Sequence, residues 1–247
     1  MKKLICIFMV PLLFSGCEID NYDEADGIIT GTVMDVTTGE GLVTEQPNGF
    51  LIYCREDSWT ASEEKRGQDF WGKADGTFRN TRIFKGSYSV YPKDGPFHTA
   101  DIDTIPVEIR SGKEAKVDFE VTPYCSFSEV IIQQSSTNSA AIVVSFKVTT
   151  NVLLGSDGDT ISHATIQNWR LFASNRTQFV GANVFDTDVS SMQDENLTAA
   201  QADGSVTITK TFTGFKAGKT YYLRIGARCK ESPQSRYNMT RVVSLSF

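Results

Sequence analysis

Apolar and polar side chains alternate with a period of two along most of the chain. In the first half the alternation begins at Gly27 and continues through residues 50–54, 105–110 and 117–121. Because successive side chains of a strand point to opposite faces, this period predicts strands with one buried face. Turn sequences separate these strands, as at Asp75-Gly76, where glycine readily supplies the positive φ of a tight turn. The pattern predicts a β-sandwich with no convincing helix.

The same period returns after Pro123-Tyr124-Cys125, where a proline follows a completed strand and indicates a domain boundary. We therefore expect an all-β chain of two tandem β-sandwich domains, residues 27–122 and residues 123–247. Strands of the second domain are predicted at residues 142–148, 169–173, 206–208 and 240–247.

The first residues follow a different pattern. Two lysines precede an apolar run that ends at Phe14, and the composition turns acidic and polar immediately after Cys17. This arrangement predicts a secretory signal peptide over residues 1–16, and the apolar run is too short to span a bilayer as a helix. Residues 17–26 have few apolar side chains and are predicted to form an acidic tether.

The residues Phe14-Ser15-Gly16-Cys17 resemble the lipobox of bacterial lipoproteins. That resemblance implies that Cys17 is lipidated and holds the protein on the membrane. The alternative is an ordinary secreted protein whose signal ends near a cysteine. The acidic residues after Cys17 resemble the patch associated with surface export in Bacteroidetes lipoproteins, which implies a surface-facing outer-membrane protein.

Charge and cysteine content exclude several classes of function. The chain has 24 Lys and Arg against 30 Asp and Glu and no basic block, which argues against nucleic acid as a partner. Of the later cysteines, Cys54 and Cys229 are interpreted as small core residues, and a bridge between Cys125 and Cys229 stays open. No two cysteines form a C-x-x-C pair, and the only histidines are His98 and His163. We therefore expect no zinc site and no cofactor.

The segment 55–74 interrupts the strand rhythm and carries Trp59, Phe70 and Trp71 among charged side chains. On a loop, these aromatic side chains could form a flat platform for sugar rings. The alternative is that Trp59 and Trp71 pack the loop onto its own sandwich, since large aromatic side chains are usually buried.

In the second domain, Trp169 is interpreted as a core residue. The segment from Phe215 to Ala227 resembles the entry to strand F of fibronectin type III domains. In that resemblance Tyr221 is the tyrosine-corner residue, whose hydroxyl bonds back to the backbone. The loop 155–159 is rich in Asp and Gly, but it lacks the spaced ligands of a calcium loop and is interpreted as a plain turn.

Four short motifs of the first domain resemble, in their order, the transthyretin-like or carboxypeptidase-regulatory-like module, which is non-catalytic. These motifs are Gly31-Thr32-Val33-Met34-Asp35, Thr38-Gly39, Asp75-Gly76-Thr77-Phe78 and Gly86-Ser87-Tyr88-Ser89-Val90. The whole arrangement resembles the DUF3823 lipoproteins of Bacteroidetes, which accompany SusD-like proteins in Sus-like glycan-uptake loci. The resemblance implies a place at the outer membrane and supplies no catalytic residues.

The sequence also contains no G-x-S-x-G, H-E-x-x-H or phosphate-loop motif. We expect a non-catalytic accessory module that binds a glycan or a partner such as a SusD-like or porin-like outer-membrane protein. The alternative is a structural or fimbrial-type anchor without a ligand of its own. A glycosidase is disfavoured because two small sandwiches rarely build the deep cleft that hydrolysis needs.

Overall fold

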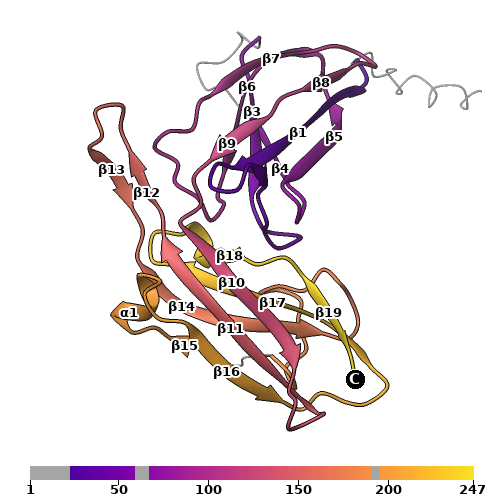
Figure 1. Cartoon of the computed structure of the whole chain (residues 1–247). Helices are drawn as coiled ribbons and strands as arrows, with labels where there is room; N and C mark the ends of the chain where they lie inside the picture. Colours follow the sequence, from indigo (N-terminus) through magenta and orange to yellow (C-terminus); the bar gives the residue numbers. More distant parts are fainter. Residues whose placement is uncertain (1–22, 59–66, 191–194) are drawn as a thin grey trace, which may run out of the picture.

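The computed structural model describes residues 23–58, 67–190 and 195–247 of the chain. Cys17, Trp59, the predicted signal peptide and most of the predicted tether lie outside these ranges. The described residues form two β-sandwiches that follow one another along the chain (Figure 1). The predicted all-β fold with two tandem sandwiches is confirmed. Within the described residues, no helix has both the length and the apolar character needed to cross a membrane.

The first sandwich contains two sheets. One has the order β2-β1-β5, with β8 and β9 parallel to β1, and the other has the order β4-β3-β6-β7. The strands are β1 (Gly27–Asp35), β2 (Glu40–Gly41), β3 (Leu51–Glu56), β4 (Gly67–Trp71), β5 (Thr77–Ile83), β6 (Gly86–Lys93), β7 (Ile105–Ile109), β8 (Glu114–Lys116) and β9 (Phe119–Val121).

The alternation in β1 has a direct structural cause. Ile29 and Val33 are fully buried in the core between the two sheets. Gly31 lies between them on the same face, where an added Cβ would come within 1.6 Å of the carbonyl oxygen of Val117. The position tolerates only glycine because the parallel neighbour passes so close to it.

The second sandwich also contains two sheets. The sheet β10-β11-β16 packs on the sheet β15-β14-β17-β18, in which β19 also pairs with β17. The elements are β10 (Cys125–Gln134), β11 (Ala141–Thr150), β12 (Val152–Leu154), β13 (Thr160–His163), β14 (Ile166–Ser174), β15 (Glu195–Asn196), α1 (Ala199–Ala202), β16 (Ile208–Thr213), β17 (Thr220–Cys229), the 3-10 helix η1 (Pro233–Ser235), β18 (Tyr237–Met239) and β19 (Val243–Ser246).

Strand β10 was not predicted from the sequence. Its pairing with β11 shifts register between Ser128 and Ile131, and Glu129 has a positive φ of 52°. This bulge interrupts the alternation, and most side chains of the strand are at least partly exposed. The period of two is therefore weak where the second domain begins.

The predicted interruption at 55–74 is shorter in the structure. Strand β3 continues to Glu56, and β4 occupies residues 67–71 and pairs with β3. Phe70 and Trp71 therefore lie on a strand, not on a loop. Only Phe70 of this edge strand is directed toward the core, and the other side chains are exposed. The sequence therefore shows no alternation of apolar and polar residues here.

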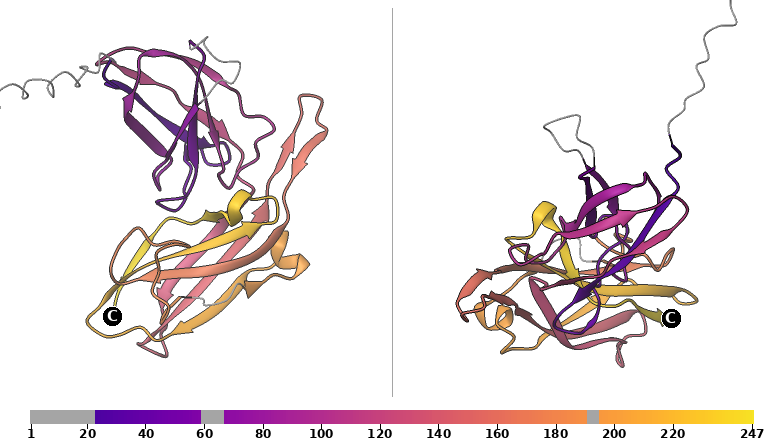
Figure 2. Two further views of the ribbon diagram at one scale, coloured as in Figure 1. Left: turned by 180° about the vertical axis from the view of Figure 1, so that it is seen from behind. Right: turned by 90° about the horizontal axis from the view of Figure 1, so that it is seen from above.

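Strands β12 and β13 form a separate two-stranded hairpin that leaves the second sandwich and extends beside the first domain (Figures 1 and 2). The turn between them is the predicted turn at 155–159, closed by a hydrogen bond of 2.8 Å from the Gly155 N–H to the Asp159 carbonyl oxygen. The hairpin is held to the first domain by His98, whose contacts are described below.

Candidate functional site

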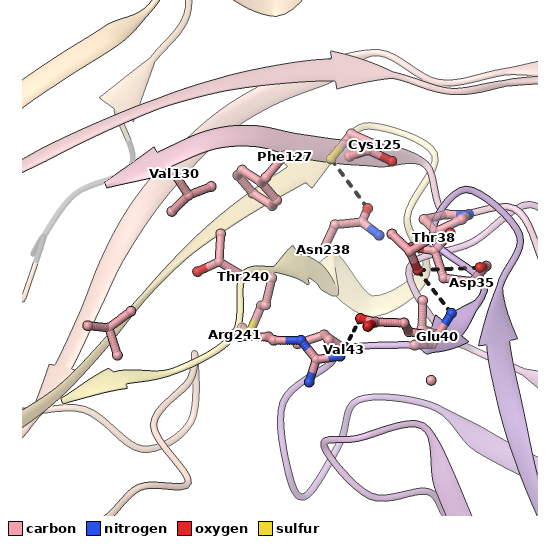
Figure 3. A pocket seen from close by; sticks show the side chains of 16 residues that line it. Asp35, Thr38, Glu40, Val43, Cys125, Phe127, Val130, Asn238, Thr240 and Arg241 are labelled. Carbon is pink, nitrogen blue, oxygen red and sulfur yellow. Dashed lines mark hydrogen bonds and ion pairs between the residues drawn. The ribbon is translucent and has the colours of Figure 1, made fainter. Parts of the chain in front are cut away.

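A groove with a cavity volume of about 360 Å³ opens between the two domains (Figure 3). Its first wall comes from the end of β1, the following turn and β2. Its second wall comes from β10, β18 and the start of β19. We call this feature the interdomain groove. Its lining includes Asp35, Thr38, Glu40, Phe127, Asn238 and Arg241.

Polar side chains of both domains meet at the rim of the interdomain groove. Arg241 donates to Glu40 across the rim at 2.5 Å, and both side chains are more than 60% exposed, at 66% and 62%. The carboxylate of Asp35 accepts hydrogen bonds of 2.7 Å from the backbone and the hydroxyl of Thr37. These bonds fix the turn that forms the first wall, because Asp side chains readily close such turns on themselves.

Apolar side chains complete the lining of the groove. Phe127 packs against the core residue Phe146 with ring centroids 5.8 Å apart, which fixes its position on β10. Val130, on the same strand, is 36% exposed. The groove thus combines an apolar wall with hydrogen-bonding groups at its rim, the composition expected of a small-ligand site.

A second set of polar residues lies between the domains, next to the groove along the chain, and its three charged members are buried. We call Glu45, Asn183, Arg224 and Arg236 the charged seam. The Glu45 carboxylate accepts from the backbone and the side-chain amide of Asn183 at 3.3 and 3.2 Å. It also lies 4.0 Å from Arg236. Burial raises the pKa of Glu45, and the contacts with Asn183 and the two arginines oppose that rise.

Arg224 is the most deeply buried charge of the seam, at 2% exposure. It projects from the outer face of β17 and donates to the carbonyl oxygen of Thr44 in the first domain at 2.8 Å. Burial lowers the pKa of Arg224 to about 10, and Glu45 opposes that shift. A buried guanidinium needs such partners. Moving a charge from water into the protein interior costs on the order of several kcal/mol, even after the surroundings relax.

His98 forms a further contact between the domains. Its Nε2 lies 3.1 Å from the carbonyl oxygen of Asn151 and therefore donates to it. Its Nδ1 lies 2.9 Å from the hydroxyl of Ser162 on β13, which then donates to the ring. The ring also packs edge-on against Tyr124, with centroids 4.8 Å apart. These contacts fix the hairpin against the first domain.

The structure separates the residues predicted to form an aromatic platform. Phe70 points into the first core, where its ring lies 6.1 Å from that of Phe78, so it is not part of a surface platform. Trp71 points to the other side of β4 and is 40% exposed. The guanidinium of Arg236 from the second domain lies 5.0 Å from its ring centroid. Successive side chains of a strand point to opposite faces, so Phe70 and Trp71 cannot form one platform. Trp59 lies outside the described residues.

Two predicted structural residues lie in the second core. Trp169 is 3% exposed and packs edge-on against Phe146, with centroids 4.9 Å apart. Tyr221 is 2% exposed, and its hydroxyl accepts a hydrogen bond of 3.2 Å from the backbone N–H of Lys216. This bond runs back to the backbone five residues upstream, which is the geometry of a tyrosine corner.

Cys54, Cys125 and Cys229 are buried free thiols. Burial raises the pKa of Cys54 to about 12, which keeps this thiol protonated. Within residues 23–58, 67–190 and 195–247, no three His, Cys, Asp or Glu side chains come together in a way that could hold a metal ion.

The family model described as the N-terminal domain of DUF3823, a protein family of unknown function, matches residues 27–122. The first sandwich is therefore a DUF3823 N-terminal domain. The match covers the first sandwich from the start of β1 to the end of β9. A search among curated proteins found no match.

Solved structures of DUF3823 family proteins share the two-domain fold. One from Bacteroides uniformis is 21% identical with a TM-score of 0.70, covering 90% of this chain and 99% of that one. One from Parabacteroides merdae is 20% identical with a TM-score of 0.66, covering 91% and 100%. A candidate carbohydrate binding protein from Bacteroides uniformis is 23% identical with a TM-score of 0.68, covering 90% and 99%. At these identities the likeness shows the fold alone.

Sequence reasoning missed the interdomain groove and the charged seam. Both combine residues far apart in the chain, such as Asp35 with Arg241 and Glu45 with Arg224. An available signal was Arg224 between the apolar residues Leu223 and Ile225, because a charge there needs a partner.

Proposed function

We propose that this DUF3823 protein is a non-catalytic carbohydrate-binding module held at the outer membrane by lipid on Cys17, with the interdomain groove as its binding site. The observation that carries the proposal is the composition of that groove. An apolar wall around Phe127 and Val130 suits the C–H faces of a sugar ring, and the rim supplies donors and acceptors for hydroxyl groups. The description of a structural neighbour as a candidate carbohydrate binding protein supports the same assignment.

The carboxylates of the groove favour binding over hydrolysis. A glycosidase uses a protonated acid and a free carboxylate on either side of the bond to be cut. Here Asp35 is held by Thr37, and Glu40 is paired with Arg241 at an exposed rim. Both carboxylates therefore already serve contacts that shape the groove.

Calorimetric titration against a panel of soluble polysaccharides tests the site. Thr38 is exposed and lines the groove, so Thr38→Trp should narrow it and weaken binding at least tenfold. Thr211→Trp places the same side chain on the exposed face of β16 and should leave affinity unchanged. Should Trp71→Ala abolish binding while Thr38→Trp does not, the site is at Trp71 and the groove assignment is wrong.

The attachment to the outer membrane has its own test. Cys17→Ala should move the protein from the membrane fraction to the soluble periplasmic fraction, because the lipidated residue is lost. Protease treatment of intact cells should remove the wild-type protein if it faces outward. Protection that ends only when the outer membrane is opened would place it on the periplasmic side and contradict glycan capture at the surface.

A second candidate function is docking to a SusD-like or porin-like protein. It is favoured by the β12–β13 hairpin, where Val152, Leu154 and Ile161 are 46%, 57% and 53% exposed. Apolar side chains gathered on a projecting element are typical of contact surfaces. Leu154→Asp should reduce cross-linking to such a partner and leave carbohydrate binding unchanged. If cross-linking persists, the hairpin is not the contact.

A further inference from the structure

Two cysteines lie in the core of the second domain, one on each of its two sheets. Cys125 begins β10 in one sheet, and Cys229 ends β17 in the other. Each is 2% exposed, and both belong to the same hydrophobic core. Side chains of two packed sheets interdigitate, so residues at matching ends of facing strands meet.

The Cys125 thiol lies at the end of β17: its Sγ is 3.5 Å from Oδ1 of Asn238, and Asn238 pairs with Ala227, two residues before Cys229. The pKa of Cys125 is raised well above the ordinary value for a thiol, first by its interaction with the thiol of Cys229 and then by burial. Cys54 is fully buried in the separate core of the first domain. Among these three cysteines, Cys125 and Cys229 are therefore the pair that shares one core.

We propose that Cys125 and Cys229 form a disulfide when the chain folds in an oxidising compartment. For the protein in the cell, this inference depends on the export included in the proposed function. The two thiols lose two protons and two electrons as their sulfur atoms join. A disulfide oxidant, such as glutathione disulfide or a thiol–disulfide oxidoreductase, accepts the electrons and is reduced to two thiols.

The bond would lie directly behind the wall of the interdomain groove, because Cys125 is one of its lining residues (Figure 3). The Cys125 thiol donates to the Asn238 side-chain oxygen at 3.5 Å, and the Asn238 amide donates to the carbonyl oxygen of Pro96 in the first domain at 2.8 Å. Oxidation removes the thiol proton and frees the Asn238 oxygen as an acceptor. The redox state of the pair therefore changes the hydrogen bonding offered by the groove wall.

Counting thiols in the refolded protein tests the pairing without reference to location or ligand. The full chain with Cys6→Ser and Cys17→Ser keeps only Cys54, Cys125 and Cys229. After refolding with glutathione disulfide, denaturation and labelling with a maleimide, we expect one labelled thiol, against three when a reductant is added first. Non-reducing peptide mapping should join the peptides that contain Cys125 and Cys229.

Two variants complete the test. Adding Cys125→Ser should give two labelled thiols in both conditions, and adding Cys54→Ser should give none after oxidation and two after reduction. Three labelled thiols after oxidation, or a map that joins Cys54 to either partner, would overturn the proposal. A failure of carbohydrate binding would leave these counts unchanged, so the two proposals fail separately.

Discussion

Two acid–base pairs join the same stretch of the first domain to the second domain, one inside the protein and one in water. Glu45 and Arg236 have side chains that are 5% and 9% exposed. Glu40 and Arg241 lie a few residues away, and their side chains are 62% and 66% exposed. The first pair belongs to the charged seam, and the second forms the rim of the interdomain groove.

The surroundings of the two pairs differ as much as their exposure. Glu45 is held by Asn183 as well as by charge, and Arg224 reaches the backbone of Thr44. Each of these contacts crosses between the domains, so the buried set fixes how they meet. The open pair has water as an alternative partner and can rearrange when a ligand enters. The buried acid–base pair therefore holds the two domains rigidly, whereas the exposed pair can adapt to a ligand.

The largest effect is expected from Glu45→Ala. It leaves two buried guanidinium groups without their carboxylate, and removing one partner of a buried pair costs about 3 kcal/mol or more. Urea unfolding measures the loss in the free energy of unfolding. A loss no larger than that of a surface substitution would show that the charged seam does not hold the domains together.

Glu45→Gln sharpens this test, because it keeps an oxygen for Asn183 and removes only the charge. The pKa of Glu45 is raised in the folded protein, so its carboxyl binds a proton more readily than in the unfolded chain. The advantage of wild type over Glu45→Gln should be greatest below pH 4.5 and should shrink as the pH rises through the folded pKa. An advantage that grows with pH would contradict this assignment.

Tyr221→Phe extends the comparison to a polar contact inside one domain. Losing the bond from the Lys216 N–H should cost about 1 kcal/mol, the usual value for one hydrogen bond. Thermal melting measures the change, and Tyr222→Phe, at a partly exposed neighbour, is the control. An unchanged melting temperature for Tyr221→Phe would remove the tyrosine-corner assignment.

A smaller, pH-dependent effect is expected at His98. Burial lowers its pKa, while the Asn151 carbonyl, Asp101 and Glu231 oppose that shift and His163 adds to it. Because the folded pKa lies below 6.5, the contribution of His98 is present above that pH and is lost as the pH falls through the folded pKa. Wild type should therefore lose more stability than His98→Gln between pH 7.5 and 5. Parallel melting curves for the two proteins would exclude this role.

The smallest effect is expected from Arg241→Ala at the groove rim. Exposed ion pairs contribute about 0.5 kcal/mol or less, because water competes for both charges. Urea unfolding should barely distinguish the variant from wild type. A loss comparable to that of Glu45→Ala would mean that the rim, too, fixes the domains.

The sequence predicted the fold well because burial on one face of a strand leaves a period of two. Motifs such as Gly31-x-Val33 carried further information, since the close approach of Val117 allows only glycine at the first position. The same period misled at Phe70 and Trp71, where an edge strand resembled a loop. The bulge at Glu129 concealed the start of β10 for a similar reason.

The groove and the seam could not be predicted, because no local pattern records which surfaces of two domains meet. Glu40 and Arg241 are 201 positions apart, and each is an ordinary surface residue when taken alone. Only the relative position of the two sandwiches brings them together. Arg236 likewise covers Trp71, a side chain that the sequence alone presents as free for a ligand.

Strand β1 also sets a length scale for the proposed attachment. It begins at Gly27, at the end of the first domain away from the second, and its nine residues end at Asp35 beside the groove (Figure 1). At about 3.3 Å per residue, the strand spans about 30 Å. If Cys17 carries lipid as proposed, the first domain would act as a spacer that holds the groove about this distance farther from the bilayer than Gly27. Polymers too bulky to approach the lipid headgroups would then still reach the groove.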